Sequence, residues 1–131
     1  MELTGRVIKR GTAAGRALVS PEPIGFLGGV DPETGVIIEK GHPLEGACVI
    51  GTVLCFPTGK GSTVGSYTLY WMKKVGTAPA AILNAESETI VAVGAIISDI
   101  PMLDRLDLSR ITTGDWVEVE GTTVEVRKTV E

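Results

Sequence analysis

The residues best suited to chemistry lie in one glycine-rich stretch near the middle of the chain, residues 56–67 (FPTGKGSTVGSY). In this stretch the ammonium group of Lys60 stands two positions before the hydroxyl of Ser62, and the hydroxyl of Ser66 follows. Glycines in a turn expose backbone N–H groups, which together with a cation can bind an anion or stabilise a serine alkoxide. A serine stabilised in this way can act as a general base. Ser62 is therefore a candidate base; the alternative is that it only caps a helix.

The same stretch does not match two common nucleotide-binding motifs. A P-loop requires Ser or Thr directly after its lysine, but Gly61 follows Lys60. The dinucleotide fingerprint G-x-G-x-x-G needs a third glycine at the position that Val64 occupies. Nucleotide binding is therefore not expected.

The other reactive side chains are few. His42 is the only histidine, and its place in a turn before Pro43 favours a packing role over membership of a serine–histidine–acid triad. Cys48 and Cys55 are seven positions apart in apolar surroundings, so on one extended strand they would point to opposite faces as buried, inert thiols. One histidine and two separated cysteines are too few for a metal site, so we expect no metal in this chain.

Composition narrows the classes of protein that need be considered. The 131 residues suffice for one domain, 1–131, with 44% hydrophobic and 21% charged residues. A net charge of −4 and 5% aromatic residues do not suit a nucleic-acid partner. Residues 1–6 do not resemble a signal peptide, and the apolar run Ile90–Ile97 is too short to span a membrane. We therefore expect a cytoplasmic protein.

Regular elements are predicted on both sides of the glycine-rich stretch. The apolar run 47–56 leads into it as a buried strand or strand pair, and a helix is expected from Ser66 to Val75, stopped by Gly76. Residues 78–84, 90–97 and 100–103 then form a strand, a helix and a second strand, which is a β-α-β unit. A helix start with acids in its first turn is expected at 85–88.

Both ends of the chain are predicted to be β-structure. A first strand over 3–10 returns through a turn as a strand over 16–20, and 36–39 forms a short strand. Residues 116–120 and 123–127 alternate between apolar and charged side chains and form a hairpin. Between these elements, Gly28 and Gly29 allow the backbone to approach a neighbour closely, although they also suit a plain tight loop. The expected fold is a mixed α/β domain with a closed or curled sheet and helices on one side.

Three blocks of this sequence are similar to the small subunit of aconitase X enzymes. They are residues 26–35 (FLGGVDPETG), 42–46 (HPLEG) and 56–67, and the similarity extends to 78–80, 100–101 and 113–115. The resemblance implies the swivelling β/β/α domain of the aconitase superfamily. It also implies a hydro-lyase that dehydrates (R)-5-phosphomevalonate to trans-anhydromevalonate 5-phosphate in the archaeal mevalonate route to isoprenoids.

The resemblance further implies how the work is divided between two chains. Ser62 would be the proton acceptor, and this chain would bind no cofactor, while a large subunit would hold a [4Fe–4S] cluster and complete an obligate heteromer. The residues expected to bind the small phosphorylated hydroxy acid or to stabilise the base are Lys60, Gly61, Thr63, Gly28, Gly29 and Ser66. Two alternatives remain: a dehydratase subunit for another small hydroxy acid such as a hydroxyproline, and a non-catalytic swivelling or docking module.

Overall fold

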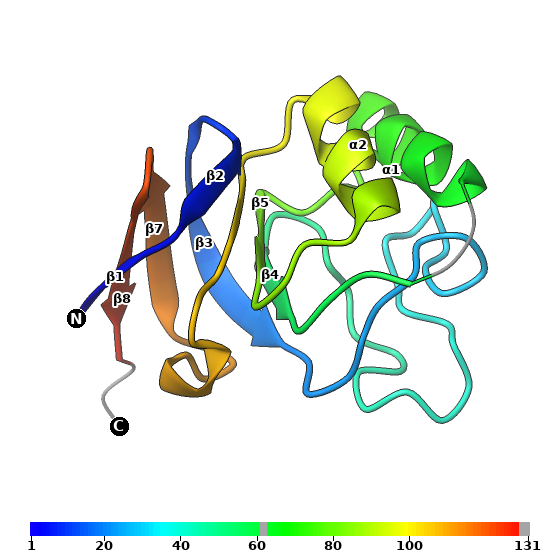
Figure 1. Cartoon of the computed structure of the whole chain (residues 1–131). Coiled ribbons are helices and arrows are strands. Elements are labelled where there is room, and N and C mark those ends of the chain that lie inside the picture. The colour runs from blue at the N-terminus through cyan, green and yellow to red at the C-terminus, as the bar shows by residue number, and fades with distance from the viewer. Residues whose placement is uncertain (61–62, 129–131) are drawn as a thin grey trace.

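The computed structural model describes residues 1–60 and 63–128. Two helices lie on one side of an eight-stranded sheet whose strand order is β1-β8-β7-β3-β4-β5-β6-β2 (Figure 1). The strands are β1 (Glu2–Thr4), β2 (Arg6–Lys9), β3 (Thr12–Val19), β4 (Val53–Phe56), β5 (Ala81–Asn84), β6 (Met102–Asp104), β7 (Trp116–Glu120) and β8 (Thr123–Arg127). The helices are α1 (Val64–Val75) and α2 (Thr89–Ser98), with a short 3₁₀ turn η1 (Leu108–Arg110).

The middle of the sheet is parallel. Strand β3 pairs with β4, β4 with β5 and β5 with β6, all in the same direction, whereas the outer pairs are antiparallel. The predicted β-α-β unit is confirmed as β5-α2-β6, and the predicted C-terminal hairpin is confirmed as β7 and β8. The loops that follow β3, β4 and β5 leave from the same edge of the sheet, which is the edge where ligands bind in parallel sheets.

The two ends of the sheet are joined by one residue of the chain. Strands β1 and β2 are consecutive in sequence but lie at opposite ends of the strand order, with only Gly5 between them. The sheet therefore curls until the end of β1 and the start of β2 are neighbours. Within the described residues no ladder of hydrogen bonds joins β1 to β2, so the sheet is curled rather than closed. A Cβ on Gly5 would lie 2.8 Å from the carbonyl oxygen of Asp104, which requires glycine at this crossing.

Three strand predictions were wrong. Residues 3–10 are two strands rather than one, and they pair with β8 and β6 instead of forming a hairpin with β3. Only Val53–Phe56 of the apolar run 47–56 is a strand. Residues 36–39 make isolated bridges to Val30 and Cys48, because the left-handed glycines Gly35 and Gly41 interrupt extended backbone on either side.

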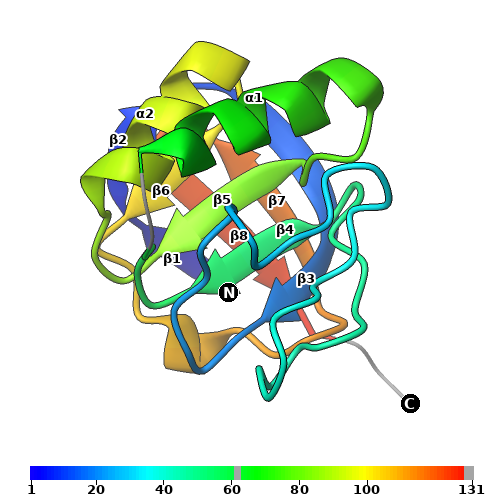
Figure 2. The same cartoon turned by 90° about the vertical axis from the view of Figure 1, so that its right-hand side faces the viewer.

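The apolar core has two parts, one on each face of the parallel strands. Leu54, Phe56 and Ile82 face α1 and α2, while Val53 and Leu83 face the interior of the curl. Burial on both faces explains why these strands consist almost entirely of apolar residues. Both helices cover the same face (Figure 2), and among the described residues neither is long and apolar enough to cross a membrane.

Candidate functional site

The loop after β4 is held by a second segment that runs beside it. Gly59 forms a parallel bridge with Ile24, the backbone N–H of Ile24 donates to Thr58 O at 3.3 Å, and that of Lys60 donates to Ile24 O at 3.2 Å. A Cβ on Gly25 would lie 2.5 Å from the carbonyl oxygen of Lys60, so the two backbones touch where only glycine fits. Residues 58–60 therefore have a defined path at the edge of the sheet.

The glycine pair predicted for the site lies on this second segment. Gly29 is buried, and a Cβ there would overlap the carbonyl oxygen of Gly25. Gly28 is exposed and has a left-handed φ of 78°. The carbonyl of Gly29 accepts a hydrogen bond from Ile38 N at 2.9 Å, which brings the segment after residue 36 to the same place. The close approach that the glycines predicted is thus an approach to this chain's own backbone.

Lys60 is paired with an acid that sequence reasoning did not single out. Its Nζ lies 2.9 Å from Oε2 of Glu39, and the two side chains are 47% and 33% exposed. A Cβ on Gly29 would lie 3.7 Å from Oε1 of the same carboxylate. The structure therefore brings Lys60 and Gly29 together, with Glu39 between them.

The two helices begin near this loop, but the hydrogen bonds of their first backbone N–H groups differ. At α2, the carboxylate of Glu88 accepts hydrogen bonds from the backbone N–H groups of Ile90 at 2.7 Å and Val91 at 3.2 Å. At α1, the N-cap residue Thr63 is exposed and its side chain makes no capping bond to the described residues. The first N–H groups of α2 thus bond to a side chain of its own N-cap residue, whereas no side chain of the described residues is seen to cap α1.

Ser66 is used within the fold. It is 6% exposed, and its Oγ donates to the carbonyl oxygen of Ile90 at 2.7 Å, which ties α1 to the first turn of α2. Its predicted role in the site stays a prediction, as do those of Lys60 and Thr63. Gly61 and Ser62 lie outside the described residues, so the roles predicted for them stay predictions too.

The thiols and the histidine have structural surroundings. Burial, and secondarily the charge of Asp115, raises the pKa of Cys55 to about 12. Cys48 is exposed, so the prediction that both thiols are buried was wrong; Cys48 lies in the loop before β4 rather than on the strand. His42 is buried, its Nδ1 accepts from Leu44 N at 3.0 Å and its Nε2 lies 3.1 Å from Pro23 O, which confirms a packing role.

These side chains do not suit an iron–sulfur cluster. Fe–S clusters are held by several thiolates, and one of the two thiols here is buried with a raised pKa. Among residues 1–60 and 63–128, no group of three or more histidine, cysteine, aspartate or glutamate side chains could hold a metal ion. A cluster would have to be held by another chain.

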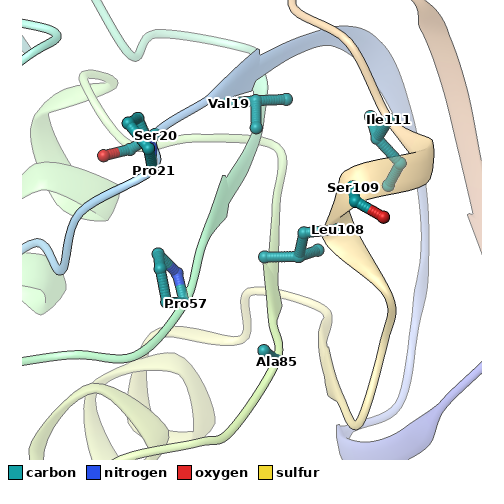
Figure 3. A pocket seen from close by; sticks show the side chains of 8 residues that line it. All are labelled: Val19, Ser20, Pro21, Pro57, Ala85, Leu108, Ser109 and Ile111. Atoms are coloured by element: carbon teal, nitrogen blue, oxygen red, sulfur yellow. The ribbon is translucent and has the colours of Figure 1, made fainter.

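A separate hollow of about 330 Å³ lies at the ends of β3, β4 and β5 (Figure 3). Its wall is mainly apolar and includes Val19, Pro21, Pro57, Ala85, Leu108 and Ile111. The hydroxyl of Ser20 in this wall is bonded to the backbone of Glu22, and that of Ser109 to the carboxylate of Asp107. With no cation in its wall, this hollow does not suit an anionic substrate, unlike the neighbourhood of Lys60.

Comparison with known proteins agrees with this geometry. A family model described as the aconitase X swivel domain matches residues 2–127. The chain is 59% identical to the phosphomevalonate dehydratase small subunit of Methanocella arvoryzae (93% of this chain, 95% of the relative) and 52% identical to that of Thermococcus kodakarensis (96% and 95%). It superimposes with a TM-score of 0.95 on a chain in the crystal structure of Thermococcus kodakaraensis aconitase X in its holo-form, at 50% identity and covering 98% and 99% of the two chains.

Proposed function

This chain belongs to the aconitase X swivel-domain family, and from that premise we propose that it is the small subunit of a phosphomevalonate dehydratase, a hydro-lyase of the mevalonate pathway. The observation that carries the proposal is similarity above half identity over almost the full length of relatives that bear this name. The proposed reaction is dehydration of (R)-5-phosphomevalonate to trans-anhydromevalonate 5-phosphate, in the cytoplasm. The chain acts only together with a large subunit.

The proposed part of this chain in the reaction is to remove a proton. Ser62 stands in the sequence between Lys60 and Thr63, the N-cap residue of α1. A serine is a strong enough base only as the alkoxide, which requires nearby positive charge in a site with little water. The ammonium of Lys60 and the first N–H groups of α1 are the groups that would supply this charge.

Lys60 does not act alone in this proposal. Because its ammonium is paired with the carboxylate of Glu39, Lys60 would stabilise the alkoxide at short range, as a charged N–H donor, rather than through a long-range field. Glu39 holds the ammonium of Lys60 in place as an N–H donor. Glu39 is in turn positioned by the hydrogen bond from Ile38 N to Gly29 O. Glu39 is therefore a positioning residue rather than a catalytic one.

The [4Fe–4S] cluster implied by the family is assigned to the large subunit, because the thiols of this chain do not fit it. The substrate consequently meets groups from both chains, and the heteromer is the active unit.

The test is Ser62→Ala in the enzyme reconstituted with its large subunit. We expect normal assembly and a turnover lower by about 10²–10⁴-fold, which is the usual contribution of a general base. Ser109→Ala, which removes a hydroxyl outside the site, is the matched control and should retain wild-type turnover. Near-normal turnover of the Ser62 variant would refute the assigned role.

The substrate is tested in the same preparation. We expect the wild-type pair to dehydrate (R)-5-phosphomevalonate, with product followed by mass spectrometry. Activity on a hydroxyproline alone would change the substrate class, and assembly without activity on either compound would leave a docking module as the function.

A further inference from the structure

The outer face of α2 is apolar, as a buried helix face would be, although it is exposed to solvent. The helix Thr89–Ser98 contains no charged residue. Its outward positions Val93, Ile96 and Ile97 are nevertheless 43–49% exposed. Helices that are apolar all round are normally buried, and surface helices carry charge on their outer side. The exposed face of α2 thus has no covering element within residues 1–60 and 63–128.

A groove on this face runs between the two helices. Its volume is about 420 Å³, and its walls include Tyr67 from α1 and Ile90, Val93 and Ile97 from α2. The helices lie side by side on the outside of the molecule (Figures 1 and 2), and Gly94 permits their close approach, since a Cβ there would lie 3.2 Å from Cα of Ser66. None of the residues in the wall is charged, so the groove suits apolar or aromatic side chains.

One end of the groove is continuous with the candidate site. Thr63 lines the groove and is also the N-cap residue of α1, whose first N–H groups we assign to the site. Gly59 lies against α2 at the same end, where an added Cβ would be 2.5 Å from Cγ2 of Val91. A chain seated in the groove would therefore lie next to the candidate site.

We propose that the groove between α1 and α2 is a docking surface for the large subunit, which inserts an apolar or aromatic side chain between Tyr67 and Ile97. This inference rests on the proposed function, because it takes the large subunit as the occupant. A second copy of this chain fits less well, since a copy seated at Thr63 would cover the approach to the site. Occupation by the large subunit instead covers α2 and leaves the site between the two subunits.

The test places a charge in the groove and measures assembly rather than turnover. Ile97→Asp and Tyr67→Asp, one on each wall, are titrated against the large subunit by calorimetry. Each should weaken binding at least about tenfold, because a carboxylate buried without a partner is costly and central interface residues dominate affinity. Ile96→Asp is the matched control: Ile96 is on the same helix and equally exposed but does not line the groove, so it should bind within about threefold of wild type.

Each outcome has a defined meaning. Thermal unfolding of the isolated variants should stay close to that of the wild type, since Tyr67 is 69% and Ile97 44% exposed. If Ile97→Asp unfolds, Tyr67→Asp, at the more exposed position, keeps the test valid. Binding as tight as wild type in both groove variants overturns the inference but leaves the proposed function intact. Equal weakening by Ile96→Asp overturns the assignment to the groove, and a wild-type self-dimer that Ile97→Asp dissociates assigns the face to a second copy. Failure of the wild-type chain to bind the large subunit refutes the proposed function itself.

Discussion

Replacing Lys60 by alanine separates a chemical role from a structural one. The ammonium is 2.9 Å from the carboxylate of Glu39, but the side chains are 47% and 33% exposed. Ion pairs this open to solvent contribute about 0–1 kcal/mol to folding. Lys60→Ala should therefore lower the free energy of unfolding by less than ~1 kcal/mol, which corresponds to a fall in Tm of roughly 4 °C or less.

The effect on catalysis should be much larger. Loss of one fixed donor to a developing negative charge typically costs about 10²–10³-fold in rate. We expect kcat/KM of the reconstituted enzyme to fall by that factor in Lys60→Ala. Lys73→Ala, at the far end of α1, is the control and should leave both Tm and kcat/KM near their wild-type values.

Glu39→Gln completes a double-mutant cycle. Glutamine keeps an acceptor for the ammonium but removes the charge, so this variant alone should lose about tenfold or less in kcat/KM. If Glu39 acts through Lys60, the double variant will be no slower than Lys60→Ala alone. Losses that multiply would show that Glu39 acts on its own, and a fall in Tm above about 8 °C with intact kinetics would make Lys60 structural.

Two further predictions concern side chains away from the site. Burial raises the pKa of Asp104, but hydrogen bonds from Arg6 and from Ser87 outweigh it and hold that pKa below its usual value. The ionised carboxylate therefore stabilises the folded chain above about pH 4, and this contribution to the free energy of unfolding is lost as the pH falls further. Asp104→Asn should thus lose about 2–3 kcal/mol at pH 7 and flatten the acid limb of urea unfolding curves, whereas parallel wild-type and variant curves would contradict the role. In the folded chain at pH 8, an aromatic disulfide reagent should modify Cys48 rapidly and Cys55 only on unfolding, and fast reaction of two thiols would disprove this.

The sequence indicated local elements better than distant partners. The unit β5-α2-β6 and the hairpin β7–β8 follow from periodicity and turn residues close in sequence. Helix α1 begins at Val64 rather than Ser66, and α2 begins at Thr89 with Glu88 as its cap, a residue type outside the usual N-cap set. Strands β1 and β2 could not be paired correctly, because their partners lie about a hundred residues further along the chain.

The sequence indicated the glycine-rich loop of the candidate site but not the residues that hold this loop and its lysine in place. The spacing of Lys60 and Ser62 is visible in the sequence, and so is the glycine pair. Glu39 carries no such signal: it is a single acid after an apolar segment, and its partner is 21 residues away. The cap of α2 by Glu88 was not anticipated either, although its bonds are local, because glutamate is not among the usual N-cap residues.

The position of β1 bears on the order in which the protein can be completed during synthesis. Residues 2–4 pair with residues 123–125, and the N-terminal amino group donates to Val126 O. Strand β1 therefore has no partner until β8 has been made, on the order of ten seconds later at usual rates of synthesis. We expect pairings between segments close in sequence, such as the β7–β8 hairpin, to form first and the pairing of β1 with β8 to form last.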